Sequence, residues 1–227
     1  MTLRTFDSVD RLEQAVLVLL AGRLARSAPG PRAVMLTGGR TPLGVYRALA
    51  GRGLKPAASM HVILSDERHV PADSPESNYG NLAALVRSLG LPPSRVLRVR
   101  SDLALEEAAA DYDRALKAFV EGGGRIALGL LGLGADGHAA SLFSPRDVER
   151  GAGRFAVAVP RRPGPDRVSV TRDLLIRVER VVFMVAGPDK AGAVERFMAG
   201  DRGLPATLAV EGAARVEVWY APRANEG

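Results

Sequence analysis

A glycine-rich loop that contains an aspartate and a histidine is the part of this sequence best suited to acid–base chemistry. The loop reads GLGADGHAASLF over residues 132–143 and follows an apolar run. Histidine titrates near neutral pH, so His138 suits a general base, and Asp136 lies two residues before it. We expect a short helix to start at His138, with backbone donors that stabilise an oxyanion. A lone histidine is more often structural, but the neighbouring aspartate favours catalysis.

A second polar loop follows another apolar run and carries two carboxylates and a guanidinium. It reads SDERH from Ser65. Such a cluster is commonly a solvated loop; in the alternative interpretation, Asp66 orients a sugar or another catalytic group and Arg68 contacts phosphate with its planar fork. Ser77 and Asn78 begin the next helix and could simply cap it.

A third loop, TGGRTP over residues 37–42, has two glycines directly before a helix. Glycines allow a phosphate to approach the backbone, and a helix start presents N–H groups to an anion. The candidate phosphate contacts are Gly38, Gly39, Arg40 and Thr41. The loop matches neither GxxxxGK[ST] nor GxGxxG, so it is no standard nucleotide motif, and a purely structural turn remains the alternative.

The remaining candidate site residues are less specific signals of function. Arg167 and Lys190 are two further cations that could bind an anion. Taken alone, each is more typical of an ordinary surface residue. His61 and His69 are interpreted as structural, and without cysteines or HExxH spacing we expect no metal and no cofactor. A serine nucleophile is disfavoured, because GxSxG is absent and Ser141 has no obvious partner.

The elements that must position these loops alternate between strand and helix. Apolar runs predict strands at 33–36, 61–64, 96–99, 126–131, 154–159, 167–170, 180–186 and 216–220. Periodic segments predict helices from Ser8 to about Ser27, from Thr41, and at 78–89, 105–120 and 189–198. This order predicts one three-layer α/β/α domain over residues 1–227, with a mostly parallel, Rossmann-like sheet. Ligands bind beyond the carboxyl ends of such strands, where the three loops should meet.

Composition narrows the class of protein. The net charge of +6 and the pI of 10.3 could indicate nucleic-acid binding, but only 5% of residues are aromatic and they do not interleave with the basic ones. There is no cysteine, no signal-peptide pattern and no apolar stretch long enough to span a bilayer. We expect a cytoplasmic protein that is a monomer or weak homo-oligomer and binds neither nucleic acid nor membrane.

Taken together, the loops resemble the 6-phosphogluconolactonase family over about residues 8–220. The similar segments are LTGGRTPLGVYRAL from Leu36, DER with a downstream SN, LGLGADGHAASLF from Leu131, RVS from Arg167, FMVAGPDK from Phe183, and LPA from Leu204. The resemblance implies hydrolysis of 6-phospho-D-glucono-1,5-lactone to 6-phospho-D-gluconate in the oxidative pentose phosphate pathway. The small-molecule partner is then a sugar-phosphate lactone.

The resemblance also implies roles for individual residues. It assigns proton transfer to His138 and support of the site to Asp66. Substrate and phosphate binding fall to Gly38, Gly39, Thr41, Arg68, Asp136, Gly137, Arg167 and Lys190. Two positions depart from the family pattern: Arg40, where serine is usual, could contact phosphate or point to solvent, and Ser144 precedes Pro145.

Two other functions remain open on the sequence. Glucosamine-6-phosphate deaminases resemble lactonases around Asp136, Gly137 and His138, but their loop continues with an asparagine–glutamate pair. Here it continues with Ser141 and Leu142, so lactone hydrolysis is preferred. A non-catalytic sugar-phosphate sensor is the other alternative, and the single N-terminal helix leaves no room for the DNA-binding module that such regulators carry.

Overall fold

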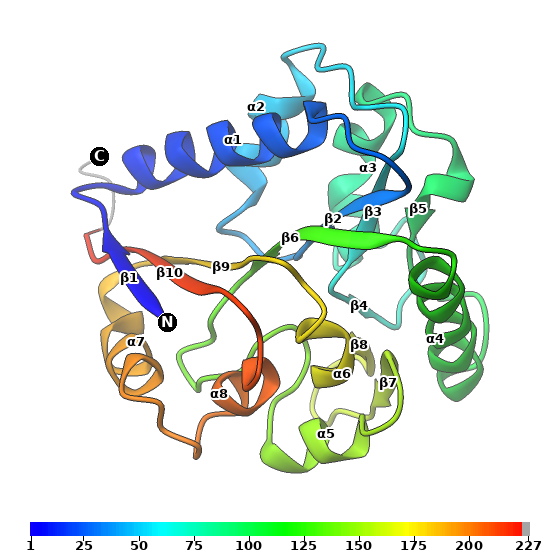
Figure 1. The fold of residues 1–227 in the computed structure, drawn as a ribbon. Coiled ribbons are helices and arrows are strands. Elements are labelled where there is room, and N and C mark those ends of the chain that lie inside the picture. Colours follow the sequence, from blue (N-terminus) through cyan, green and yellow to red (C-terminus); the bar gives the residue numbers. More distant parts are fainter. Residues whose placement is uncertain (224–227) are drawn as a thin grey trace.

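The fold is built around a seven-stranded parallel sheet with the order β1-β10-β9-β6-β2-β3-β5 (Figure 1). The computed structural model describes residues 1–223, and residues 224–227 of the predicted domain lie outside the described part. The strands of this main sheet are β1 (Thr2–Thr5), β2 (Arg32–Leu36), β3 (Met60–Leu64), β5 (Val96–Leu97), β6 (Arg125–Leu131), β9 (Val181–Ala186) and β10 (Val216–Ala221).

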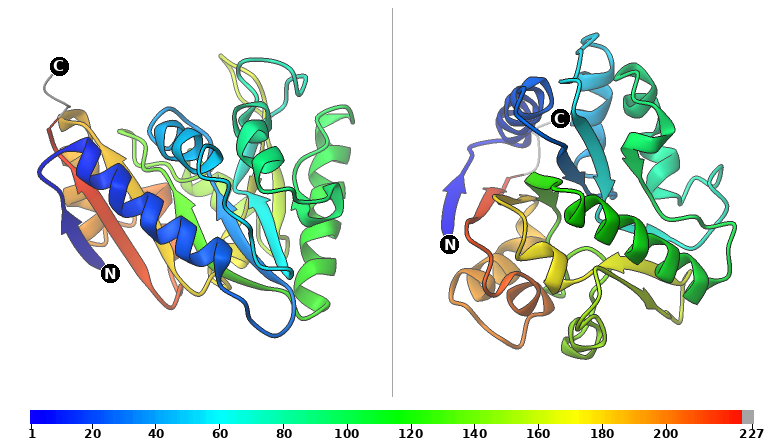
Figure 2. Two further views of the ribbon diagram at one scale, coloured as in Figure 1. Left: turned by 90° about the horizontal axis from the view of Figure 1, so that it is seen from above. Right: turned by 45° about the vertical axis from the view of Figure 1, so that its right-hand side comes forward.

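Helices cover both faces of the main sheet, which confirms the predicted three-layer α/β/α fold (Figures 1 and 2). One face carries α1 (Val9–Ala25), α2 (Leu43–Ala50) and α3 (Asn78–Ser88). The other carries α4 (Leu105–Glu121), α5 (Pro145–Arg150), α6 (Arg172–Leu175), α7 (Ala191–Met198) and α8 (Pro205–Val210); the 3-10 turns are η1 (Pro93–Arg95) and η2 (Pro188–Lys190). No helix within residues 1–223 is both long and apolar enough to cross a membrane.

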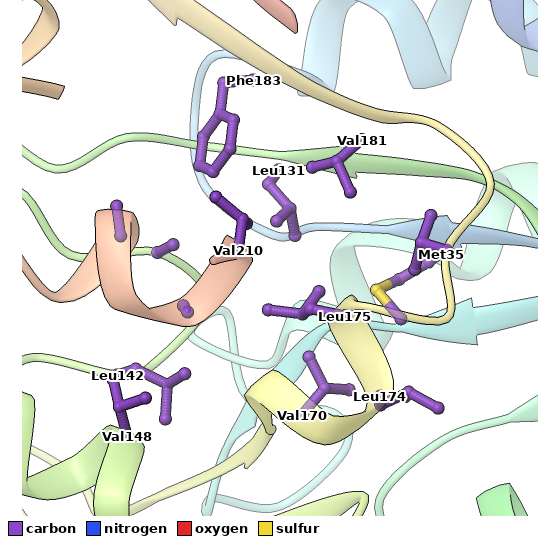
Figure 3. Close-up of a cluster of buried hydrophobic side chains, with 14 of the residues drawn as sticks. Met35, Leu131, Leu142, Val148, Val170, Leu174, Leu175, Val181, Phe183 and Val210 are labelled. Carbon is purple, nitrogen blue, oxygen red and sulfur yellow. The ribbon is translucent and has the colours of Figure 1, made fainter. Parts of the chain in front are cut away.

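Each face of the sheet packs its own apolar core. Between the sheet and α6 and α8, Leu131 and Phe183 point toward Leu175 and Val210 (Figure 3). These side chains are almost fully buried, and burying an aliphatic or aromatic side chain of this size contributes about 1.5–3 kcal/mol. The two cores fix the strands, so their carboxyl ends form a rigid platform for the loops.

Several features of the fold differ from the sequence predictions. β1 and the short helices α5, α6 and α8 were not predicted, and β4 (Asp66–Arg68) is a strand within a segment expected to be a loop. β4 pairs antiparallel with β8 (Arg167–Val170), which pairs with β7 (Ala156–Val159), so these strands form a separate sheet. Asp66 and Glu67 are buried, and buried backbone groups must be hydrogen bonded; pairing with β8 meets this need.

Candidate active site

A pocket of about 210 Å³ lies beyond the carboxyl ends of β2, β3, β6 and β9. The loops after Leu36, Leu64 and Leu131 all contribute to its wall. Seven of the residues singled out in the sequence line it: Gly38, Gly39, Thr41, Asp66, Arg68, His138 and Lys190. The structure therefore brings a histidine, a carboxylate and two cations to one cavity.

Four other singled-out residues do not line this pocket. Arg40 is exposed beside it. Gly137 has a φ of +82°, and an added Cβ would lie 2.4 Å from Leu204 Cδ2, so glycine is required there for the turn. Arg167 is half-buried and donates to the carbonyl of Pro165. Asp136 contacts the pocket only through His138.

His138 and Asp136 form a hydrogen-bonded pair. His138 Nδ1 lies 2.5 Å from Asp136 Oδ1, and the imidazole packs against Phe143 with ring centroids 4.7 Å apart. Burial raises the pKa of Asp136, but the hydrogen bond and the charge of His138 outweigh it and lower that pKa below its ordinary value. An ionised carboxylate only accepts hydrogen bonds, so Nδ1 carries a proton, and in the neutral form of the imidazole Nε2 has the lone pair. The pair thus presents a base at Nε2.

The helix expected at His138 is absent, and this prediction was wrong. Ala140 has a φ of +51°, which interrupts a right-handed helix, and Ala139 and Leu142 form an isolated bridge. The next helix is α5, which begins at Pro145 after Ser144, the N-cap that accepts from Asp147 N. Backbone donors of a helix start are therefore not available beside His138.

Two glycines make room for side chains of the pocket. At Gly134 an added Cβ would lie 2.1 Å from His138 Nδ1 and 2.3 Å from Asp136 Oδ1. At Gly38 it would lie 1.8 Å from Asn78 Oδ1. Sequence analysis missed the role of Gly134, although its place in a glycine-rich loop was a signal. Both glycines are required by close approach of functional side chains.

Asp66 is held by two serine hydroxyls. Ser65 Oγ donates to Asp66 Oδ1 and Ser141 Oγ donates to Asp66 Oδ2, each at 2.7 Å. Ser141 N in turn donates to Ser169 Oγ at 3.1 Å. Ser141 was expected to lack a partner; this was wrong, because its partner is 75 residues away in the sequence. The network joins the histidine loop to β4 and β8.

The neighbouring carboxylate, Glu67, caps α3. It accepts from the backbone N–H groups of Asn78 and Tyr79 at 2.6 and 2.7 Å, and Ser77 is the N-cap as expected. Burial raises the pKa of Glu67, and the backbone hydrogen bonds oppose this. Asn78, missed as a site residue, lines the pocket; its Nδ2 donates to Asp66 O at 3.0 Å, while Oδ1 has no partner within residues 1–223.

Positive charge gathers at the pocket. Arg68 Nη1 donates to Glu76 O at 2.7 Å, and Lys190 Nζ lies 3.4 Å from Asp189 Oδ2. Arg167 is paired with Arg68 across β4 and β8; burial and then the Arg68 charge lower the pKa of Arg167. This excess of cations suits an anion. In residues 1–223 no three His, Asp or Glu side chains gather where they could hold a metal ion.

Comparisons with known proteins agree with this geometry. Residues 7–219 match the family model described as glucosamine-6-phosphate isomerases/6-phosphogluconolactonase. A 6-phosphogluconolactonase of Thermotoga maritima is 35% identical, with 82% of each chain covered, and that of Homo sapiens is 33% identical over 89% of this chain and 84% of its own. The crystal structure of a Thermotoga maritima 6-phosphogluconolactonase superposes with a TM-score of 0.81 at 28% identity, covering 98% of this chain and 99% of that one. The chain belongs to the glucosamine-6-phosphate isomerase/6-phosphogluconolactonase family.

Proposed function

We propose that the protein hydrolyses 6-phospho-D-glucono-1,5-lactone to 6-phospho-D-gluconate, which is one reaction of the oxidative pentose phosphate pathway. The observation that carries the proposal is that His138, supported by Asp136, shares one pocket with Arg68 and Lys190. A base and an anion site in one cavity match an ester that carries a distant phosphate. The curated relatives named above are lactonases, which supports the same reaction.

In the first step, His138 Nε2 takes a proton from a water molecule as the water oxygen bonds to C1 of the lactone. Because no helix begins at His138, the resulting tetrahedral oxyanion would be held by other backbone N–H groups of the pocket wall. When the bond between C1 and the ring oxygen breaks, protonated His138 returns the proton to that oxygen, and the ring opens to the acid. General acid–base catalysis of this kind increases the reaction rate by about 10²–10⁴-fold. The residues of the chain and water supply the whole reaction.

The phosphate is bound by Arg68 and Lys190, with Gly38, Gly39 and Thr41 shaping that end of the pocket. Arg167, the neighbour of Arg68 across β4 and β8, adds positive potential. Asp66, fixed by Ser65 and Ser141, orients the sugar hydroxyls as an acceptor. Positioning the lactone through its phosphate converts a bimolecular encounter into an oriented one, which is a large part of catalysis.

The direct test is hydrolysis of freshly prepared lactone, measured against the unaided reaction without protein. The proposal expects rapid, protein-dependent acid release and no ammonia from glucosamine 6-phosphate measured in parallel. Ammonia release without lactone hydrolysis would instead assign deaminase activity. We further propose that the protein acts in the cytoplasm, as a monomer or weak homo-oligomer, and does not bind nucleic acid. Light scattering tests the oligomeric state, and titration with DNA tests nucleic-acid binding.

A further inference from the structure

A second cavity, of about 300 Å³, lies at the opposite end of the main sheet. It lies where β2 and β3 begin, and the connection from α1 to β2 forms part of its wall; Figure 1 shows the course of this connection. Its wall combines three arginines (Arg23, Arg26 and Arg32) and Glu179 with Met60, Ala127 and residues 27–29 of the chain between α1 and β2. We call this cavity the arginine pocket. It shares no lining residue with the candidate active site.

Cations outnumber carboxylates around the arginine pocket. Arg32 and Arg125 both reach Glu179 Oε1, at 2.6 and 3.0 Å. In the adjacent cluster, Arg180 and Arg215 both reach Glu217, at 2.8 and 2.6 Å. The remaining two arginines, 23 and 26, have no carboxylate partner among residues 1–223. Six guanidinium groups therefore face two carboxylates.

Part of this positive charge lines the cavity without a carboxylate partner among residues 1–223. Arg23, in the last turn of α1, is half-buried; burial lowers its pKa, and the charges of Arg180 and Arg26 lower it further. A helix C-terminus favours a cation, but this effect is confined to the last turn and does not account for the whole cluster. Arg32 Nε is buried without a hydrogen-bond partner in the described part of the chain. Arg32 Nε thus has no protein acceptor within residues 1–223, and the guanidinium groups of Arg23, half-buried, and Arg26, exposed, are accessible to a ligand.

We propose that the arginine pocket binds a phosphate-bearing small molecule. Guanidinium forks bind phosphate in a bidentate manner, so Arg23 and Arg26 would contact the phosphate from the open side. Met60 and Ala127 offer apolar contact to a carbon skeleton. Ligand pockets begin at roughly 300 Å³, the size seen here. The proposal does not depend on the lactonase reaction.

A small molecule fits better than nucleic acid. Single-stranded nucleic acid is bound by a charged groove with aromatic side chains on which bases stack. The described lining of the arginine pocket contains no aromatic residue, and the charge is gathered in a cavity rather than along a stripe. The observations therefore favour a compact polyanion.

The test is calorimetric titration of the full chain with inorganic pyrophosphate at low ionic strength. The test variant is Arg23→Gln/Arg26→Gln. The matched control is Arg47→Gln/Arg87→Gln, which removes the same charge from two exposed arginines in the last turns of α2 and α3. Lys190→Gln separates binding at the candidate active site. Thermal unfolding of each variant, together with the lactonase activity of the two double arginine variants, shows whether the fold is intact.

We expect the test variant to weaken one pyrophosphate site by about tenfold or more, because two charge-assisted contacts are lost. The control should keep that site, as should Lys190→Gln. Equal binding by the test and control variants would overturn the proposal, as would wild-type binding that Lys190→Gln removes completely. Tight binding of a short single-stranded DNA, abolished in the test variant and without any pyrophosphate site, would also overturn it.

Discussion

Ser141 Oγ donates a 2.7 Å hydrogen bond to Asp66 Oδ2. Both residues are buried; Asp66 begins β4, which follows β3, and Ser141 lies in the loop that follows β6. Since His138 lies three residues before Ser141, this bond fixes the position of the His138 loop relative to Asp66. Ser65, bonded to the other Asp66 oxygen, completes the arrangement.

The hydrogen bond between Ser141 and Asp66 predicts that the two residues are coupled in the free energy of unfolding. Ser141→Ala should destabilise the fold by about 1 kcal/mol, because a buried carboxylate oxygen loses its donor. Asp66→Asn should cost more, since an amide NH₂ cannot accept from a hydroxyl. In urea unfolding, the double variant should lose less than the sum of the single variants. Additive losses would show that the bond contributes nothing specific.

His138→Ala tests the proposed base. Turnover should fall by about 10²–10⁴-fold, while KM changes little, because the ring moves protons and does not hold the phosphate. Steady-state kinetics on fresh lactone measures both constants. His61→Gln is the control, since that ring contacts Ser59 O and Phe119 outside the pocket. Near-normal turnover in His138→Ala would refute the assignment.

Lys190→Gln and Arg68→Gln test the proposed phosphate site. Each should raise KM by about tenfold or more with a smaller effect on kcat, because a charge-assisted hydrogen bond to the phosphate is lost. Arg47→Gln removes the same charge from an exposed position outside the pocket and should change neither constant. Unchanged KM in both test variants would place the phosphate elsewhere.

Much of the fold could be predicted because it rests on local pattern. Apolar runs such as 126–131 became strands, Ser8 caps α1 by accepting from Arg11 N, and loops after parallel strands meet at one edge. Pairing between distant segments could not be predicted. β4 is three residues long and exists only because β8 hydrogen bonds to it about a hundred residues later.

The same limit applies to the candidate site. The pairing of Asp136 with His138 is local and could be anticipated, but the backbone after His138 could not. Ala140 has a left-handed conformation that alanine rarely adopts, so the sequence there favoured a helix. The contact of Ser141 with Asp66 likewise depends on the packing of two loops, and no residue pattern indicates it.

Gly134→Ala tests whether the glycine makes room for the Asp136–His138 pair. An added methyl group would overlap both side chains, so the imidazole must move and activity should fall by about tenfold or more. Gly132→Ala, where an added Cβ meets nothing within 4 Å, should lose far less. The kinetic comparison is made alongside thermal unfolding. Similar losses of activity in the two variants would mean that activity depends on the backbone freedom of glycine rather than on space for the Asp136–His138 pair.

The environment of Glu217 predicts that the folded state loses stability at acidic pH. Burial opposes its ionisation, but hydrogen bonds from Arg180 and Trp219 and the charge of Arg180 outweigh burial and lower the pKa of Glu217 from 4.5 to about 2. Because the pKa is lower in the folded state, the unfolded chain binds the proton more tightly. This stabilisation is complete above pH 4.5 and is lost as pH falls toward 2.

The matching variant is Glu217→Gln, which keeps the shape but removes the charge. Urea unfolding at neutral pH should show a loss of about 2 kcal/mol, since the shift is large and the carboxylate is mostly buried. The difference from wild type should shrink as pH is lowered from 4.5 toward 2, because protonated Glu217 resembles glutamine. Arg100–Asp102, an exposed ion pair, provides the control: Asp102→Asn should change stability little at neutral pH. A Glu217→Gln deficit that stays constant across this pH range would contradict the linkage.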